Sequence, residues 1–167
     1  MDAAADKQPG ALDGRTLRRV CSRYATGVAV IGAAGAQGRA VGLTVNSFAS
    51  LSLAPPLILW SLALHSPNAG LFVPAAGFGV SVLHAGQGAL ARHFATPAPD
   101  KFSGVAHRRC PAGVPYLDDA LATLACRVVR ADPIGDHLLV VGEVESCEAG
   151  EGEPLVFYGG GFVRIAA

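Results

Sequence analysis

The sequence predicts a mainly β protein, an antiparallel barrel with a few short helices. Three observations lead to this fold class: about seven apolar stretches have the length of strands, Gly, Pro and Asp turns separate them, and no strand–helix–strand rhythm is present. With 167 residues, 51% of them hydrophobic and 16% charged, the chain is long enough for one domain with its own core. We expect this domain over residues 14–167, after a flexible tail of residues 1–13.

The chain is expected to begin with a helix and a hairpin. Asp13 can cap a helix that ends near Gly27, and its apolar positions recur at helical spacing. Those positions are Leu17, Val20, Cys21 and Tyr24. Residues 28–33 then predict a strand, residues 34–38 a turn, and residues 39–45 the partner strand of the hairpin.

The remaining elements follow in the same manner. Residues 57–64 are apolar on both faces, which predicts a strand that is central or lies at an interface. Ser66 opens a short helix with Pro67 at its favoured first position. The further expected elements are a strand at 77–83, a short helix at 86–95, and strands at 121–132, 136–148 and 154–165.

The charges limit the classes of partner. The formal net charge is zero, so nucleic acid is not expected as a ligand. No acidic residue occurs between Asp13 and Asp100, a segment that contains Arg15, Arg18, Arg19, Arg23, Arg39 and Arg92. This asymmetry fits either a solvated basic helix face or a site for an anion.

Several familiar sites and locations are not indicated. The four cysteines and five histidines show no metal-ligand spacing, so no metal site is expected. The glycines at 32, 35 and 38 lack the spacing of a dinucleotide fingerprint and are interpreted as a hairpin turn. No secretory signal is visible, and the longest apolar run is too short to span a membrane, so we expect a cytoplasmic protein without a membrane contact.

One segment, residues 42–62, combines uncharged polar side chains with an apolar strand. The polar residues are Thr44, Asn46, Ser47, Ser50, Ser52 and Ser61. They could form an ordinary polar strand and turn. They also suit a flat polar heterocycle that carries a phosphate, because amides and backbone N–H groups meet ring carbonyls and nitrogens.

This segment, GLTVNSFASLSLAPPLILWSL, resembles the signature of the flavin reductase family with the FMN-binding split-barrel fold. Five further motifs follow in the family's order, so that the resemblance spans roughly residues 14–165. They are FGVSVL, ARHFATPAPDKF, GVPYLDDALATLACRVV, GDHLLVVGEVES and PLVFYGGGF. The resemblance implies a split barrel that uses FMN or FAD, with NADH or NADPH as the source of hydride.

The resemblance also implies the residues of the site. Thr44, Val45, Asn46, Ser47, Ser61 and Leu62 would lie along the flavin ring, and Ser66, Asn68, His93 and Phe94 would hold the ribityl phosphate or a neighbouring part of the flavin. His137 would lie on the nicotinamide side, as a residue that orients the nicotinamide or supplies a proton. Tyr158 and Gly159 would border the same cavity.

The function implied by the resemblance is an NAD(P)H-dependent flavin reductase. Such a protein is expected to be a homodimer and to supply reduced flavin to a partner monooxygenase. Two alternatives stay open at this point: a non-enzymatic flavin-binding module, and a split-barrel oxidase of the pyridoxamine-phosphate oxidase kind.

Overall fold

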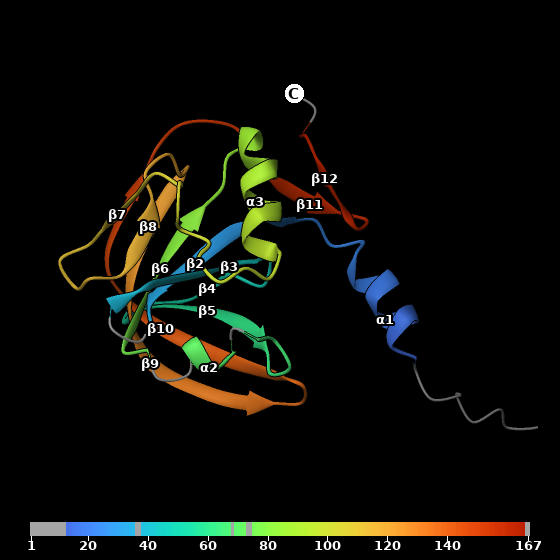
Figure 1. Cartoon of the computed structure of the whole chain (residues 1–167). Coiled ribbons are helices and arrows are strands. Elements are labelled where there is room, and N and C mark those ends of the chain that lie inside the picture. Colours follow the sequence, from blue (N-terminus) through green and yellow to red (C-terminus); the bar gives the residue numbers. More distant parts are fainter. Residues whose placement is uncertain (1–12, 36–37, 68, 73–74, 166–167) are drawn as a thin grey trace, which may run out of the picture.

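The protein is built around a seven-stranded antiparallel sheet (Figure 1). The computed structural model describes residues 13–35, 38–67, 69–72 and 75–165. The strand order is β3-β2-β6-β9-β10-β5-β4. In chain order these strands are β2 (Ala29–Ala34), β3 (Ala40–Val45), β4 (Ala49–Leu53), β5 (Pro56–Ala63), β6 (Gly77–Val82), β9 (Ala122–Ile134) and β10 (His137–Ala149).

Smaller elements surround this sheet. Two small antiparallel sheets pair β1 (Thr26–Gly27) with β11 (Val156–Tyr158) and β12 (Gly161–Val163), and β7 (His107–Arg109) with β8 (Pro115–Leu117). The helices are α1 (Gly14–Cys21), α2 (Ala69–Phe72) and α3 (Gly88–Ala95), and a 3₁₀ turn, η2 (Ala85–Gln87), precedes α3. Among the described residues, no helix is long and apolar enough to cross a membrane.

The connection between β3 and β4 forces the sheet to curl. A flat sheet of seven strands would hold its two edges about 29 Å apart, at roughly 4.8 Å per neighbouring pair. Yet the edge strands β3 and β4 are joined by residues 46–48 alone, which can span at most about 14 Å from Val45 to Ala49. The sheet is therefore a barrel that stays open between β3 and β4, and the predicted antiparallel split-barrel fold is confirmed.

Both faces of the sheet are covered at β2, which explains the continuous apolar run in this strand. Ala29, Ile31 and Ala33 face the barrel interior, where they pack in one core cluster with Trp60 and Phe78. Their neighbours in the chain alternate to the other face, as strand geometry requires, and join a second cluster beneath α3. The second cluster consists of Val28, Val30, Leu83, Ala91, Phe94, Phe102, Leu117 and Leu155.

A glycine in β3 allows α3 to approach the sheet closely. A Cβ atom at Gly42 would lie 2.7 Å from Cε1 of Phe94 and 2.9 Å from Cε2 of Phe102. Both rings are buried, and they meet edge to face with their centroids 5.0 Å apart. Only glycine leaves room for them, so this position fixes the distance between α3 and the end of β3.

The first helix differs from its prediction. Asp13 caps it as expected, accepting hydrogen bonds from the backbone N–H groups of Arg15 and Thr16, each 2.8 Å long. However, α1 ends at Cys21, and Gly27 lies in β1, where it pairs with Val156. The helix buries none of its residues, and it extends away from the sheet (Figure 1). The helical periodicity predicted the helix correctly. It also suggested an apolar face packed on a core, and no such packing is present for α1 within the described part of the chain.

Other expectations need smaller corrections. The helix predicted from Ser66 begins at Ala69, and the segment predicted as one strand at 154–165 is the hairpin of β11 and β12. The strands β1, β4, β7 and β8 were not predicted. Three of them have only two or three residues, and β4 alternates serines with apolar residues in a segment interpreted by its polar groups. The remaining strand boundaries agree with the prediction within two residues. The predicted tail lies outside the described residues except for Asp13, and its flexibility stays a prediction.

Candidate functional site

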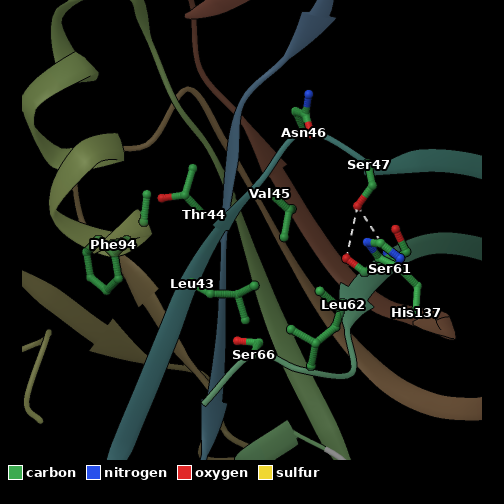
Figure 2. Close-up of a pocket in the computed structure, with 12 residues that line it drawn as sticks. Leu43, Thr44, Val45, Asn46, Ser47, Ser61, Leu62, Ser66, Phe94 and His137 are labelled. Atoms are coloured by element: carbon green, nitrogen blue, oxygen red, sulfur yellow. Dashed lines mark hydrogen bonds between the residues drawn. The ribbon is translucent and has the colours of Figure 1, made fainter. Parts of the chain in front are cut away.

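A cavity of about 270 Å³ lies at the opening of the barrel (Figure 2). The end of β3, the turn after it, the end of β5, the end of α3 and the first residue of β10 form its walls. The lining residues are Leu43, Thr44, Val45, Asn46, Ser47, Ser61, Leu62, Ala63, Ser66, Phe94, Ala95 and His137. Nine residues predicted from the family resemblance are thus brought together, from parts of the chain that are far apart in sequence.

Two of the predicted hydroxyl groups hold the walls of this cavity together. The Thr44 hydroxyl donates to the backbone carbonyl of Ala91 at 2.7 Å and so ties β3 to α3. The Ser47 hydroxyl accepts from the backbone N–H of Ser61 at 3.0 Å and donates to its carbonyl at 3.2 Å (Figure 2). Because these hydroxyls already have protein partners, their first role is to position the polar turn between the two edge strands.

Other polar groups of the cavity are left for a ligand. The Asn46 side chain is exposed, and neither its amide nor the Ser61 hydroxyl makes a hydrogen bond within the part of the chain that the structure describes. In addition, β3 is an edge strand, so alternate backbone N–H groups face away from β2. An amide, a hydroxyl and a backbone edge together offer both donors and acceptors to a planar polar ring.

His137 is held at the rim of the cavity by its neighbour. Its Nδ1 lies 2.7 Å from Oδ1 of Asp136, and this hydrogen bond, reinforced by charge, lowers the pKa of the Asp136 carboxyl. The backbone of β10 is fixed here too, because the Asp136 carbonyl accepts from the Leu64 N–H at 2.9 Å. With Nδ1 engaged, Nε2 is the ring nitrogen that remains for a ligand.

The carboxyl end of α3 is anchored next to the cavity by Lys101. This side chain is only 4% exposed, and its ammonium donates to the carbonyl of Phe94 at 2.7 Å. Burial lowers the pKa of Lys101. The Lys101 carbonyl in turn contacts Nε2 of His93 at 2.7 Å. Both contacts hold Phe94 and Ala95 in the cavity wall.

Three predicted residues do not line this cavity, and a fourth cannot be placed. The His93 ring is turned to Lys101. Tyr158 and Gly159 lie at the turn between β11 and β12, where the Gly159 N–H donates to the Ser22 carbonyl at 3.0 Å. Their binding roles stay predictions. Asn68 lies outside the described residues.

A second cavity, of about 190 Å³, adjoins the first and was not predicted. Its lining residues are Val28, Thr44, Val45, Asn46, Ala91, Arg92, Ala95, Phe157 and Phe162. Along β11, Phe157 and Tyr158 face opposite sides, and Phe157 is the one that reaches the cavity. Arg92 was visible in the sequence as one of six arginines in an acid-free segment, but nothing local connected it with the distant Phe162.

The chemistry of the site suits a flat, polar ligand that carries or gains negative charge. No Asp or Glu lines either cavity, so negative charge on a ligand meets no nearby repulsion from the walls. Within the described ranges, no group of three or more His, Cys, Asp or Glu side chains could hold a metal ion. The cavity at the split edge of this open antiparallel barrel is therefore suited to a planar polar ring such as a heterocycle.

The chain belongs to the flavin reductase like domain family, which it matches over residues 21–166. The resemblance carried by the sequence motifs is thereby confirmed, together with the class of enzyme, an oxidoreductase that acts on flavin. A flavin fits the cavity chemistry described above.

Individual relatives agree with this assignment. The chain is 39% identical over 158 residues to the NADH-dependent FMN reductase SmoA of Agrobacterium fabrum. This alignment covers 95% of the chain and 90% of the relative. It is 38% identical to the reductase component of a 4-nitrophenol monooxygenase of Rhodococcus opacus, over 90% of this chain and 80% of the relative. A solved structure of the NADH:FAD oxidoreductase SgcE6 of Streptomyces globisporus, with NAD and FAD fragments, superposes with a TM-score of 0.86 at 37% identity, over 92% of this chain and 93% of that one.

Proposed function

We propose that the protein is an NADH-dependent flavin reductase that moves a hydride from reduced nicotinamide to FMN or FAD. The observation that carries this proposal is the uncharged polar cavity at the opening of the barrel, in a chain of the flavin reductase family. The reaction balances as NADH, one proton and oxidised flavin giving NAD⁺ and reduced flavin. NADH is preferred over NADPH because both the SmoA reductase and the SgcE6 oxidoreductase are named for NADH.

The chain's own residues would bind and orient the two reactants. Flavin, when bound, supplies the hydride acceptor and gains negative charge as it is reduced. Asn46, Ser61 and the free edge of β3 would hold the polar side of the ring, and Val45 and Leu62 would contact its apolar part. Because the walls carry no carboxylate, the developing negative charge is tolerated, and the protein contributes mainly by positioning.

His137 would act on the nicotinamide side. The Asp136 carboxylate fixes the imidazole at the cavity rim, which allows Nε2 to orient the nicotinamide or to pass a proton. Ser66, in the same wall, would contact the phosphate-bearing part of the flavin. No protein nucleophile is needed.

A homodimer is part of this proposal. The edge strand β4 presents Leu51 and Leu53 to solvent, the latter 91% exposed. Leu17 and Val20 on α1, and Tyr24 in the turn after it, are exposed as well. Apolar side chains gathered on an edge strand and on an unpacked helix are typical of surfaces that a partner covers. A second copy of the chain would cover them.

Delivery of reduced flavin to a monooxygenase completes the proposal. One relative is named as the reductase component of a monooxygenase, and another structural neighbour, with a TM-score of 0.84, is the reductase component of a tryptophan halogenase. By analogy, this protein would hand its reduced flavin to a separate oxygenase. A cytoplasmic location stays a prediction from the sequence.

Steady-state oxidation of NADH and NADPH, each with and without FMN, FAD or riboflavin, tests the function. We expect turnover with NADH that saturates as free flavin is added. Tight flavin binding without turnover would contradict the proposal and favour a flavin-binding module. Turnover that ignores added flavin but depends on another substrate would favour a split-barrel oxidase.

A further inference from the structure

The second cavity continues the first one. The two cavities share Thr44, Val45, Asn46 and Ala95 as lining residues. Pockets that enclose a ligand of drug size usually reach about 300 Å³ or more, whereas these measure about 270 Å³ and about 190 Å³. Neither cavity alone meets that size, so a ligand as large as a dinucleotide would extend from the first cavity into the second.

The walls of the second cavity are mostly aromatic and aliphatic. Phe157 and Phe162 pair across the β11–β12 hairpin, with ring centroids 5.8 Å apart and an interplanar angle of 68°. Val28 and Ala91 add aliphatic surface. Such walls suit a flat aromatic base, which gains from apolar burial and from contact with ring faces or edges.

A single positive charge lies in the wall of this aromatic cavity. The guanidinium carbon of Arg92 lies 5.5 Å from the centroid of the Phe162 ring. Within the described part of the chain Arg92 forms no ion pair, as is also true of the arginines on α1, whereas Arg39, Arg108, Arg127 and Arg130 each have a carboxylate partner. Arg92 differs from the α1 arginines because it lines a cavity. Its charge is thus available to an anionic ligand, and a guanidinium is well shaped to bind phosphate oxygens in a bidentate manner.

We propose that the second cavity binds the adenosine diphosphate half of a dinucleotide, with the adenine against Phe157 and Phe162 and the phosphates at Arg92. This inference rests on the proposed flavin reductase function, since it identifies where the non-reacting half of a reactant is held. The same chemistry occurs in FAD and in NADH. Arg92 is therefore a specificity-determining residue, which separates dinucleotides from their mononucleotide counterparts.

Direct binding tests the site without any turnover. ADP is titrated calorimetrically into the purified protein and into Arg92→Gln, Arg92→Lys, Phe162→Leu and, as a control, Arg15→Gln. Arg15 is exposed on α1 and lines neither cavity, so its replacement removes the same charge elsewhere. We expect Arg92→Gln to weaken ADP binding about tenfold or more, Arg92→Lys to weaken it less, Phe162→Leu to weaken it through lost ring contact, and Arg15→Gln to leave it unchanged.

Kinetics then distinguish the two sources of the ligand. If FAD supplies the adenine half, Arg92→Gln raises the KM for FAD but not for FMN. If NADH supplies it, the same variant raises the KM for NADH but not for reduced nicotinamide mononucleotide.

Three outcomes separate this inference from the proposed function. Absence of ADP binding, or equal binding by wild type and Arg92→Gln, would overturn the second site. Unchanged KM values for both dinucleotides in an active Arg92→Gln enzyme would overturn it as well. If the protein reduced no flavin, the proposed function would fail, and the ADP titration alone would still support or overturn the site.

Discussion

At the scale of single residues, the contact between Asp136 and His137 limits how the histidine can act. The carboxylate lies 2.7 Å from Nδ1, so the ring orientation is fixed before any ligand arrives. A fixed ring can align the nicotinamide, but it contributes little area to a flavin. Binding and turnover should therefore respond differently to its removal.

We expect His137→Ala to lower kcat for flavin reduction by about tenfold, equivalent to about 1.4 kcal/mol, while FMN affinity stays within about twofold. Stopped-flow reduction by NADH and fluorescence titration of FMN measure the two quantities. Asp136→Asn, which keeps the hydrogen bond and removes the charge, should fall between wild type and His137→Ala. An equal loss of binding and of reduction in His137→Ala would place the residue in flavin binding instead.

Cys126 gives a prediction on alkaline stability. Burial chiefly, with smaller effects of Glu145 and Cys147, raises the pKa of its thiol from 9.0 to about 12. Between these values the unfolded chain releases a proton that the folded protein keeps, so the free energy of unfolding falls as the pH rises above 9. Below pH 9 the contribution is fully present.

Urea unfolding of wild type and Cys126→Ala from about pH 8 to about pH 10.5 checks this slope. The variant is less stable throughout, because it leaves a small cavity, but its stability should fall less steeply above pH 9. Lys101 and Tyr116, whose pKa values are also shifted by burial, are present in both proteins and cancel in the comparison. If the free energies of unfolding of the two proteins fell equally steeply above pH 9, the raised pKa of Cys126 would not be the cause.

At the scale of secondary-structure elements, the turn from β3 to β4 is the part that shapes the site. It joins the two edges of the sheet, and Ser47 fastens it to β5 through two hydrogen bonds with the backbone of Ser61. The sequence predicted the polar residues of this turn and, through the family resemblance, a place for them beside the flavin, which stays a prediction. It did not reveal that the hydroxyls of Thr44 and Ser47 are used within the protein, because their partners lie on other elements.

We expect Ser47→Ala to lower the free energy of unfolding by about 1–3 kcal/mol, since both backbone groups of Ser61 lose their side-chain partner. Flavin affinity should fall with it, because the cavity wall loosens. Ser50→Ala is the matched control: this serine is exposed on β4, has no side-chain hydrogen bond in the described part of the chain, and should change stability by less than about 0.5 kcal/mol. Chemical denaturation and FMN titration measure both effects. If Ser47→Ala and Ser50→Ala had similar free energies of unfolding, the two hydrogen bonds between Ser47 and Ser61 would contribute little to stability.

Element prediction succeeded where a strand has a long apolar run. The runs of β2 and β5 predicted strands; β2 is buried throughout most of its length, whereas β5 alternates between buried and partly buried residues. In α1 an apolar pattern at helical spacing was present, but none of its residues is buried. Periodicity reports which side chains could share a face. It does not report whether anything packs against that face.

At the scale of the whole molecule, a single copy of the chain leaves several large apolar side chains exposed to solvent. Part of this surface lies on β4, at Leu51 and Leu53, and on α1, at Leu17 and Val20. The proposed dimer would cover it, which yields a prediction on mass rather than on activity.

Sedimentation or light scattering should give twice the 17.0 kDa mass of the chain. Replacing Leu51 and Leu53 together by lysine should shift the protein toward the monomer, because two charges would have to be buried at the interface. Ala98→Lys, on an exposed loop, should leave the mass unchanged. A wild-type mass near 17.0 kDa at every concentration would rule the dimer out.

The sequence by itself determined the class of fold, most of the long strands and the polar segment of residues 42–62. These are local properties, because the strand period, the turn residues and the motifs each depend on residues that are neighbours in the sequence. The tertiary structure alone decided that Phe157, rather than Tyr158, reaches a cavity, and that Arg92 meets Phe162, 70 positions away. The physical reason is that these contacts join elements far apart in the chain, α3 and the β11–β12 hairpin of the small three-stranded sheet, and such long-range packing leaves no trace in local periodicity.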